Sequence, residues 1–344
     1  MINFHNDYNQ GCHPAVMEKL VQLQNQQMSG YGEDICCQTA AEKIRSACKA
    51  ENAAVHFLVG GTQTNLTVIA AALRPHQGVI SADSGHINVH ETGSVEATGH
   101  KVIQTPGEDG KVRPELVEQI VKSQSLSMDA EHIVQPKMVY ISNPTEYGTL
   151  YSLAELEELS RLCKAYRLYL FVDGARMSYG LAARGNDITL ADYARLCDAF
   201  YIGGTKCGAM FGEAVVITNP AIAEDFRYLI KQRGGMLAKG WLLGAQFDAL
   251  FTDDLYMTVA ARANAFADQI RQTLENLGYP LYMPGCTNQV FVTLPDALLE
   301  EISQNFTYAV WEKQGQAHTT VRFCTSWATT QEQVDALCAQ LRQG

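Results

Sequence analysis

The sequence carries little positive charge. It has 26 lysines and arginines against 37 aspartates and glutamates, and its formal net charge is -11. No stretch of the chain is strongly basic. Such a chain is poorly suited to gripping nucleic acid or an anionic membrane surface by electrostatics. We therefore expect neither as a partner.

Long hydrophobic runs are also missing, since no apolar stretch approaches the length needed to cross a membrane. The opening residues MINFHNDYNQ lack the basic start and apolar segment of a secretory signal. The ten cysteines include the adjacent Cys36 and Cys37 but no C-x-x-C pair. They are typical of reduced, mostly buried thiols. The expected compartment is the cytoplasm.

Several catalytic and metal-binding motifs are absent as well. There is no G-x-S-x-G, no G-x-x-x-x-G-K-[ST] and no complete G-x-G-x-x-G. His86 and His90 have the four-residue spacing of zinc ligands on a helix. However, no glutamate follows His86, and no third ligand is evident. We therefore expect no metal site.

What the chain does contain is an alternation of short apolar runs and helical patterns through about two thirds of its 344 residues. Runs buried on both faces and separated by helices favour an α/β domain with a central, mostly parallel sheet. Ser152, with Glu155 three residues later, predicts a capping box at a helix start. The seven expected strands are residues 53–59, 78–83, 100–106, 137–143, 168–174, 199–204 and 214–218.

The pattern changes after Phe251, where a long helical stretch leads into strand and helix patterns outside the strict alternation. A chain of this length exceeds what one hydrophobic core usually serves. We expect a large α/β domain with an N-terminal arm over residues 1–251. A small α+β domain is expected over residues 252–344.

Chemically useful residues follow several of the expected strands, whose carboxyl ends face a shared crevice in such sheets. Gly61 and Thr62 stand at a strand-to-helix turn that suits a phosphate group. A plain tight turn with a capping threonine is the alternative. Asp173 closes an apolar run and is suited to keeping a cofactor's ring nitrogen protonated. It is equally suited to being a helix cap or an ion-pair partner of Arg176.

Three further residues have two interpretations each. Arg176 either neutralises Asp173 or binds a substrate carboxylate through its planar fork. Lys206 either points to solvent or, if desolvated, forms an imine with a carbonyl group. His86 is either an ordinary histidine or a flat ring that lies against a cofactor. Taken together, the functional interpretations supply everything that pyridoxal phosphate requires from a protein.

Eight segments of the chain resemble those of a known family: FHNDYNQGCHPAVMEKL, GYGED, FLVGGTQTNL, GHINVHETG, VDGARM, GGTKCG, RGGML and TTVRF. In this order they resemble the threonine aldolase and β-eliminating lyase family of fold-type I pyridoxal-phosphate enzymes. The most specific combination is VDGAR followed by a Thr-Lys pair after the next strand. The resemblance implies a homodimer or homotetramer with active sites between subunits.

The resemblance also implies residue roles. Lys206 matches the imine-forming lysine, Asp173 the acid at the pyridine nitrogen, and His86 the imidazole stacked on the cofactor ring. Phosphate contacts match Gly61, Thr62 and Thr205, and substrate-carboxylate contacts match Arg176 and Arg322. Asn6 stands where relatives usually have serine near that carboxylate, and Tyr31 matches a loop residue that reaches toward a neighbouring subunit's site.

Two departures from the family pattern affect the substrate and the reaction. Glu146 stands where low-specificity threonine aldolases usually carry a histidine, and Leu237 replaces an arginine, with Lys239 nearby. The expected reaction is cleavage of the Cα–Cβ bond of a threonine-like β-hydroxy-α-amino acid. In it, Glu146 or His86 takes the hydroxyl proton. The alternatives are β-elimination, transamination and, in another class, an α/β ligand-binding protein without a cofactor.

Overall fold

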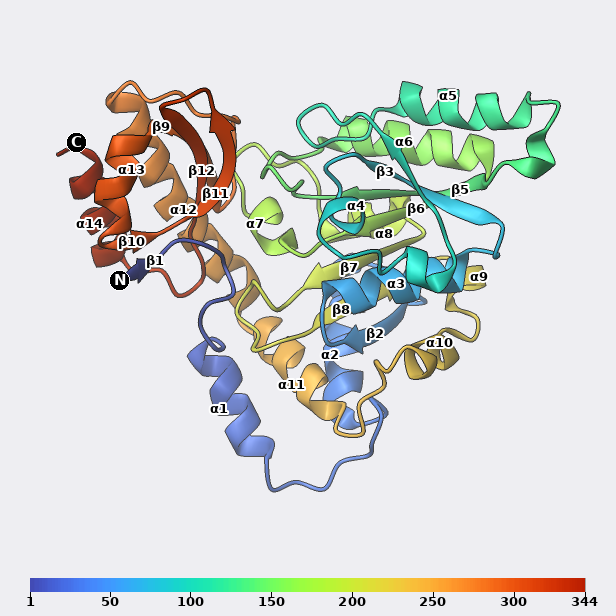
Figure 1. Ribbon diagram of the computed structural model, residues 1–344. Helices are drawn as coiled ribbons and strands as arrows, with labels where there is room; N and C mark the ends of the chain where they lie inside the picture. The colour runs from blue at the N-terminus through green and yellow to red at the C-terminus, as the bar shows by residue number, and fades with distance from the viewer. Residues whose placement is uncertain (344) are drawn as a thin grey trace.

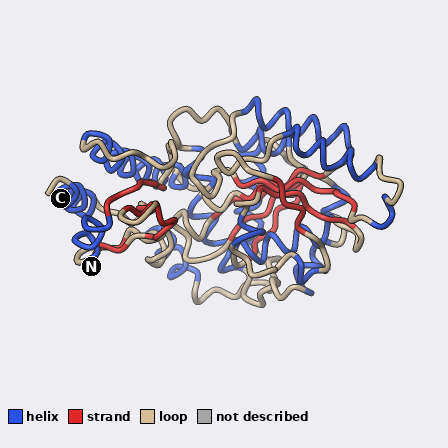
Figure 2. Tube along the Cα trace, turned by 45° about the horizontal axis from the view of Figure 1, so that its top comes forward, coloured by secondary structure: helices blue, strands red, loops and turns tan. Residues whose placement is uncertain are grey.

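A seven-stranded sheet forms the centre of the larger lobe, and helices cover both of its faces (Figures 1 and 2). The computed structural model describes residues 1–343. The expected α/β architecture is confirmed, and each of the seven expected strands is present. Their order is β2-β8-β7-β6-β5-β3-β4. Their bounds are β2 Ala54–Leu58, β3 Gln77–Ala82, β4 Val102–Thr105, β5 Gln135–Ser142, β6 Tyr169–Asp173, β7 Ala199–Gly203 and β8 Glu213–Ile217.

The sheet is parallel except for β8, which runs antiparallel to both of its neighbours, β2 and β7. β8 follows β7 through a short return, and Glu213 pairs with Gly203 across it. Every residue of β3, β7 and β8 is buried, as expected for strands covered on both faces. The loop between β7 and β8 carries Lys206 and lies at the carboxyl end of the parallel strands.

Helices of the larger lobe connect the strands and pack on the sheet. The expected capping box begins α6: the Glu155 amide donates to Ser152 Oγ, and the Ser152 amide donates to the Glu155 carboxylate at 2.7 Å. The helices are α1 Pro14–Leu23, α2 Ile35–Cys48, α3 Gly61–Ala72, α4 His86–Val89, α5 Pro114–Ser125, α6 Leu153–Tyr166, α7 Met177–Leu181, α8 Leu190–Leu196, α9 Pro220–Ala223, α10 Phe226–Gln232 and α11 Trp241–Leu250.

The smaller lobe contains an antiparallel sheet in the order β11-β12-β9. Near the N-terminus, β1 pairs with β10, so both ends of the chain lie on this lobe (Figure 1). The expected boundary after residue 251 falls just before α12 and stays a prediction. The elements are β1 Ile2–Asn3, α12 Leu255–Asn276, β9 Gln289–Pro295, α13 Asp296–Ser303, β10 Phe306–Thr307, β11 Ala309–Gln314, β12 His318–Cys324 and α14 Gln331–Leu341.

Side chains from alternate positions of the central strands enter two separate cores. Val172 and Phe200 pack into the core on one face of the sheet. Phe171 and Tyr201, from adjacent positions, pack into the core on the other face. This alternation follows from the two-residue period of a strand. Among residues 1–343, none of the helices is both long enough and apolar enough to cross a membrane.

Truncation of Phe200 tests the role of this sheet in stability. The side chain of Phe200 is fully buried in β7, so Phe200→Ala leaves a cavity and should lower the free energy of unfolding by about 3–5 kcal/mol. Leu126→Ala is the control, because Leu126 is 82% exposed and surface truncations usually change stability by less than about 0.5 kcal/mol. Urea denaturation followed by circular dichroism measures both. Equal losses of unfolding free energy in the two variants would contradict the assignment of Phe200 to the core.

Candidate active site

A pocket of about 570 Å³ opens at the carboxyl end of the parallel strands, and β11 and β12 of the smaller lobe contribute to its wall. The structure brings together in this wall nine residues that the sequence suggested: Gly61, Thr62, His86, Glu146, Asp173, Arg176, Thr205, Lys206 and Arg322. Tyr8, His90, Tyr201, Glu213 and Trp311 also line it. Asn6 and Tyr31 are not part of this wall within the same chain.

Asp173 ends β6 and is 4% exposed. The Tyr140 hydroxyl donates to Oδ2 at 2.6 Å, and the Tyr201 hydroxyl donates to Oδ1 at 2.5 Å. The Asn65 side chain donates to Oδ2 at 3.1 Å. Burial raises the pKa of Asp173, but the charge of His86 and the two tyrosine hydrogen bonds outweigh burial and lower it below its ordinary value. Asp173 is therefore held as a carboxylate.

His86 begins α4 and is fixed by a buried acid. Its Nδ1 lies 2.8 Å from Oε1 of Glu91, which also accepts from Asn65 at 2.7 Å. Because a carboxylate only accepts, Nδ1 carries hydrogen in both forms of the ring, and Nε2 is an acceptor in the neutral form only. Asn65 donates to both Glu91 and Asp173. One network thus ties the imidazole to the acid at the end of β6.

Glu146 lies in the loop after β5 and is also anchored. Its Oε1 accepts from the His86 backbone amide at 3.0 Å and from Ser142 Oγ at 2.7 Å. Burial and the charge of Asp173 raise the pKa of Glu146 from its ordinary value, although the Ser142 hydrogen bond opposes the shift. Among residues 1–343, no hydrogen bond engages Oε2. That oxygen is free for a ligand.

Lys206 lies in the turn between β7 and β8, beyond the last residue of β7. Burial and the charge of Arg176 lower the pKa of Lys206 below its ordinary value, against the opposing charges of nearby carboxylates. The Tyr179 hydroxyl donates to the Lys206 carbonyl at 2.6 Å and holds the turn. Only the unprotonated amine attacks a carbonyl carbon, and a lowered pKa makes this form of the lysine more abundant.

Asp7 is an active-site residue that the sequence did not reveal. Its carboxylate is 1% exposed and accepts from Arg176 through Nε at 2.7 Å and NH2 at 3.0 Å. Asn288 also donates to it, at 2.9 Å. Burial raises the pKa of Asp7, but Arg176, Lys206 and Asn288 hold it well below its usual range. The N-terminal arm therefore fixes the fork of Arg176 from outside the large sheet.

Arg322 comes from β12 and reaches the pocket from the smaller lobe. Its NH1 donates to Gln289 Oε1 at 2.9 Å, and its NH2 donates to the His5 carbonyl at 3.1 Å. Its Nε is buried and has no partner within residues 1–343. In the same part of the chain, NH1 of Arg176 makes no hydrogen bond. Both arginines thus keep donors for a further anion.

The turn at the start of α3, Gly60 to Thr62, is where the sequence suggested a phosphate group, and it is called the α3 cradle below. Gly60 caps α3, and a Cβ added at Gly60 would meet no atom within 4 Å. A Cβ at Gly61 would lie 2.9 Å from the Tyr201 hydroxyl, which donates to Asp173. Glycine at position 61 thus keeps that hydrogen bond intact beside the helix N-terminus. Backbone amides at such a terminus favour an anion.

The residues present fit pyridoxal phosphate. The cradle at α3, the ionised Asp173 and Lys206 with its lowered pKa all face one pocket, and two arginines retain donors near it. Within residues 1–343, no group of three or more histidine, cysteine, aspartate or glutamate side chains is arranged to hold a metal ion. The expectation that no metal is bound stays a prediction.

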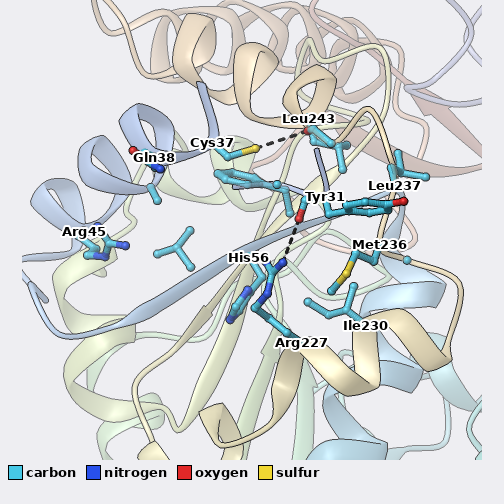
Figure 3. Close-up of a pocket in the computed structure, with 16 residues that line it drawn as sticks. Tyr31, Cys37, Gln38, Arg45, His56, Arg227, Ile230, Met236, Leu237 and Leu243 are labelled. Atoms are coloured by element: carbon cyan, nitrogen blue, oxygen red, sulfur yellow. Dashed lines mark hydrogen bonds between the residues drawn. The ribbon is translucent and has the colours of Figure 1, made fainter. Parts of the chain in front are cut away.

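Asn6 and Tyr31 lie elsewhere. Asn6 Oδ1 accepts from the Tyr8 amide at 3.0 Å, so Asn6 turns the chain beside Asp7. Tyr31 is 47% exposed and lines a second cavity of about 180 Å³ (Figure 3). Its carbonyl accepts from Arg227 NH2 at 3.2 Å. The prediction that Tyr31 reaches a neighbouring subunit's site stays a prediction.

Removal of the Asp7 charge tests the N-terminal anchor. Asp7→Asn leaves the Arg176 guanidinium buried without its counter-ion, a change that typically costs about 3–5 kcal/mol. The folded-state pKa of Asp7 is depressed, so its contribution is present above the unfolded-state value of about 4 and is lost as pH falls through the folded value. Denaturant unfolding should therefore show a stability gap between wild type and Asp7→Asn at pH 7 that narrows below about pH 4. A gap independent of pH would contradict the ion pair.

Comparison with known proteins gives consistent results. The chain matches the family model for beta-eliminating lyase over residues 5–297. A low specificity L-threonine aldolase of Pseudomonas aeruginosa is 29% identical over 98% of this chain and 96% of its own length. The solved structure of Leishmania major threonine aldolase is 44% identical, has a TM-score of 0.97, and covers 100% of this chain and 99% of its own.

A more distant structure shows how widely the fold is shared. A Thermus thermophilus aspartate aminotransferase has a TM-score of 0.74 at 16% identity, and covers 100% of this chain and 91% of its own. At that identity the likeness concerns the fold alone. The arrangement of the sheet and the small lobe is therefore found in proteins of only 16% identity.

Proposed function

The chain belongs to the threonine aldolase and β-eliminating lyase family, and we propose that it cleaves threonine or allo-threonine to glycine and acetaldehyde with pyridoxal phosphate. The observation that carries this proposal is the meeting of Lys206, Asp173 and the α3 cradle in one pocket. The 44% identity to the Leishmania major threonine aldolase supports the reaction class. When bound, the cofactor accepts the electron pair released at the substrate Cα.

Residues of this chain would hold and orient the cofactor. Gly61, Thr62 and Thr205 would bind its phosphate, and Lys206 would supply the amine for its aldehyde. Asp173 would keep the ring nitrogen protonated, because an adjacent negative charge favours the charged form of the ring. His86 would cover the ring, and Glu91 fixes the orientation of the imidazole.

Substrate orientation is the task of the two arginines. The substrate carboxylate accepts from the guanidinium groups of Arg322 and Arg176, which both line the pocket. A carboxylate fixed at two points sets which bond at Cα faces the cofactor, and such positioning contributes strongly to rate. Asp7 holds Arg176 in place for this contact.

The β-hydroxyl proton must leave for the Cα–Cβ bond to break, and two groups in the pocket have an open acceptor: His86 at Nε2 and Glu146 at Oε2. We assign this proton to Glu146. Its pKa is raised by burial and by Asp173, which brings it toward the working pH, as suits a general base. The proton moves from the hydroxyl oxygen to Oε2, the aldehyde departs, and an equivalent proton returns from Oε2 to Cα, which gives glycine and restores the Glu146 carboxylate.

The assembly and compartment are part of this proposal. The working unit is a homodimer or homotetramer with active sites between subunits, in the cytoplasm. The exposure of Tyr31 at 47% and of Ile35 at 61% supports a contact between subunits on that loop and helix. The ten cysteines carry no disulfide, which suits a reducing compartment.

Replacement of Lys206 tests the function directly. Lys206→Ala should keep the fold but lose the yellow colour of the cofactor-loaded protein and its release of acetaldehyde from threonine. Lys164→Ala, which removes an exposed lysine of α6, is the control and should retain both. Absorbance and a coupled acetaldehyde assay measure the outcome, with 2-oxobutanoate, the product of β-elimination from threonine, measured in parallel. Near-normal activity of Lys206→Ala, or 2-oxobutanoate as the main product of wild type, would contradict the proposal.

Replacement of Glu146 tests the proton assignment. Because the pKa of Glu146 is raised, wild-type kcat/KM should fall as pH drops through that raised value, since the protonated carboxyl no longer accepts. Glu146→Gln should remove this acid limb and reduce kcat/KM by about 10²-fold or more. Glu146→His should recover part of the rate, since imidazole is also a base. An unchanged pH profile in Glu146→Gln would assign the proton to another group.

A further inference from the structure

Glu213 is a buried carboxyl in the pocket wall for which the proposed reaction has no use. It is 4% exposed and starts β8, where it pairs with Gly203 at the end of β7 and with Leu58 at the end of β2. The turn with Lys206 follows β7, and the α3 cradle follows β2. Glu213 therefore lies where the lysine turn and the cradle both leave the sheet.

The hydrogen bonds of Glu213 occupy the Thr205 hydroxyl. Oε2 accepts from the Gly204 amide at 2.8 Å, and Oε1 accepts from Thr205 Oγ1 at 2.8 Å. Thr205 Oγ1 in turn accepts from the Gly212 amide at 3.0 Å. A hydroxyl has one hydrogen to donate, and the Glu213 carboxylate at 2.8 Å is a nearer acceptor than the Gly212 carbonyl at 3.5 Å. While the hydroxyl donates this hydrogen to Glu213, it has none for a phosphate.

The surroundings of Glu213 allow its carboxylate to take up a proton near neutral pH. Burial raises the pKa of Glu213 to about 7, with Asp173 acting in the same direction and Lys206, Thr205 and Gly204 opposing it. An ordinary glutamate would stay ionised far below this pH. The titratable groups that face Glu213 are Lys206 and Cys207 from the turn, Asp173 from β6, Tyr201 from β7 and Tyr256 from α12.

A phosphate monoester in the cradle brings a charge of about -1.5 to -2 at neutral pH, and like charges disfavour each other's ionised forms. We propose that Glu213 takes up one proton from solvent when a phosphate group enters the cradle, and that this proton frees the Thr205 hydroxyl to donate to the phosphate. This inference rests on the proposed function, because it takes the cradle to be the phosphate site of the cofactor.

After proton uptake, every donor and acceptor of Glu213 and Thr205 in this exchange still has a partner. Protonated Glu213 donates to Thr205 Oγ1, which still accepts from the Gly212 amide, so both acceptor positions of the hydroxyl are filled. The hydrogen of the hydroxyl then turns to a phosphate oxygen. One proton passes from solvent to a carboxyl oxygen, and no bond to carbon changes. Glu213 is thus a positioning residue that couples cofactor affinity to pH.

The test measures proton uptake with a ligand that cannot react with Lys206. The full-length chain, freed of cofactor, is titrated with 4-deoxypyridoxine 5′-phosphate, which carries the ring and phosphate but no aldehyde. Calorimetry in two buffers of different ionisation enthalpy gives the number of protons taken up. Wild type should take up little at pH 6.5 and approach one proton at pH 8.5. Its Kd should rise by up to about tenfold per pH unit above pH 8.

Glu213→Gln keeps the shape and places a permanent donor beside Thr205. It should abolish the uptake at pH 8.5 and bind the ligand at that pH at least as tightly as wild type, with little change in Kd between pH 7.5 and 9. Glu224→Gln, which removes an exposed carboxyl, is the control and should behave as wild type. Circular dichroism checks that each variant folds.

Three outcomes of the titration would contradict the inference. Uptake that persists in Glu213→Gln assigns the proton to another group, such as Lys206, and overturns the inference. Wild type that binds the ligand without uptake at pH 8.5 also overturns it, whether or not the variant folds, and leaves the proposed function standing. A ligand that fails to bind wild type at any pH overturns the proposed function and this inference together.

Discussion

A carboxylate kept ionised inside the protein is the constraint on which the pocket depends. Asp173 stays charged at 4% exposure because the charge of His86 and the hydrogen bonds from Tyr140 and Tyr201 lower its pKa, and Asn65 also donates to it. These donors come from strands β5 and β7 and from helix α3, so the charge fixes how three elements meet. An ionised acid in such a place would otherwise lose its charge or destabilise the fold.

The same constraint reaches the phosphate cradle and the imidazole. The Tyr201 hydroxyl that holds Asp173 leaves no room for a side chain at position 61, and this keeps the start of α3 open to an anion. Asn65 joins Asp173 to Glu91, and Glu91 orients His86. One hydrogen-bond network therefore positions Asp173 and the His86 imidazole, and the Tyr201 hydroxyl of the same network restricts position 61 of the cradle.

Charge balance explains why the pocket contains more acids than the chemistry first suggests. Lys206, Arg176 and Arg322 bring basic groups into the pocket wall. Arg176 pairs with the Asp7 carboxylate, and the charges of Asp7, Asp173 and Glu213 act on Lys206. Asp7 neutralises and orients Arg176. Burial raises the pKa of Glu146 above its ordinary value and raises that of Glu213 to about 7. Buried groups tuned in this way are typical of active sites.

Much of this could be predicted from the sequence, for identifiable reasons. Apolar runs bounded by Gly, Asp or Asn mark strands buried on both faces, and the residues that follow them converge because parallel strands end on one edge. An apolar run does not show direction, so the antiparallel course of β8 was not predicted. Strand β11 was missed because it is an edge strand with an exposed Val310 and few buried residues.

The hydrogen-bond and ion-pair partners of the site residues could not be predicted from the sequence. Asp7 meets Arg176 across 169 residues of sequence, and no local pattern indicates a contact at that separation. Tyr140 and Tyr201 read as ordinary core aromatics, since the use of their hydroxyls depends on which strands become neighbours. The residues expected to hold pyridoxal phosphate could be recognised in the sequence because they are few and chemically distinct.

The most direct measurement of the central claim is the protonation of the ring nitrogen in pyridoxal phosphate bound to this protein, read by ¹⁵N NMR of labelled cofactor. If Asp173 lies as a carboxylate against the ring, the nitrogen shift is that of a protonated pyridinium in wild type and that of an unprotonated ring in Asp173→Asn. An unprotonated nitrogen in wild type, or the same shift in both proteins, would contradict the account.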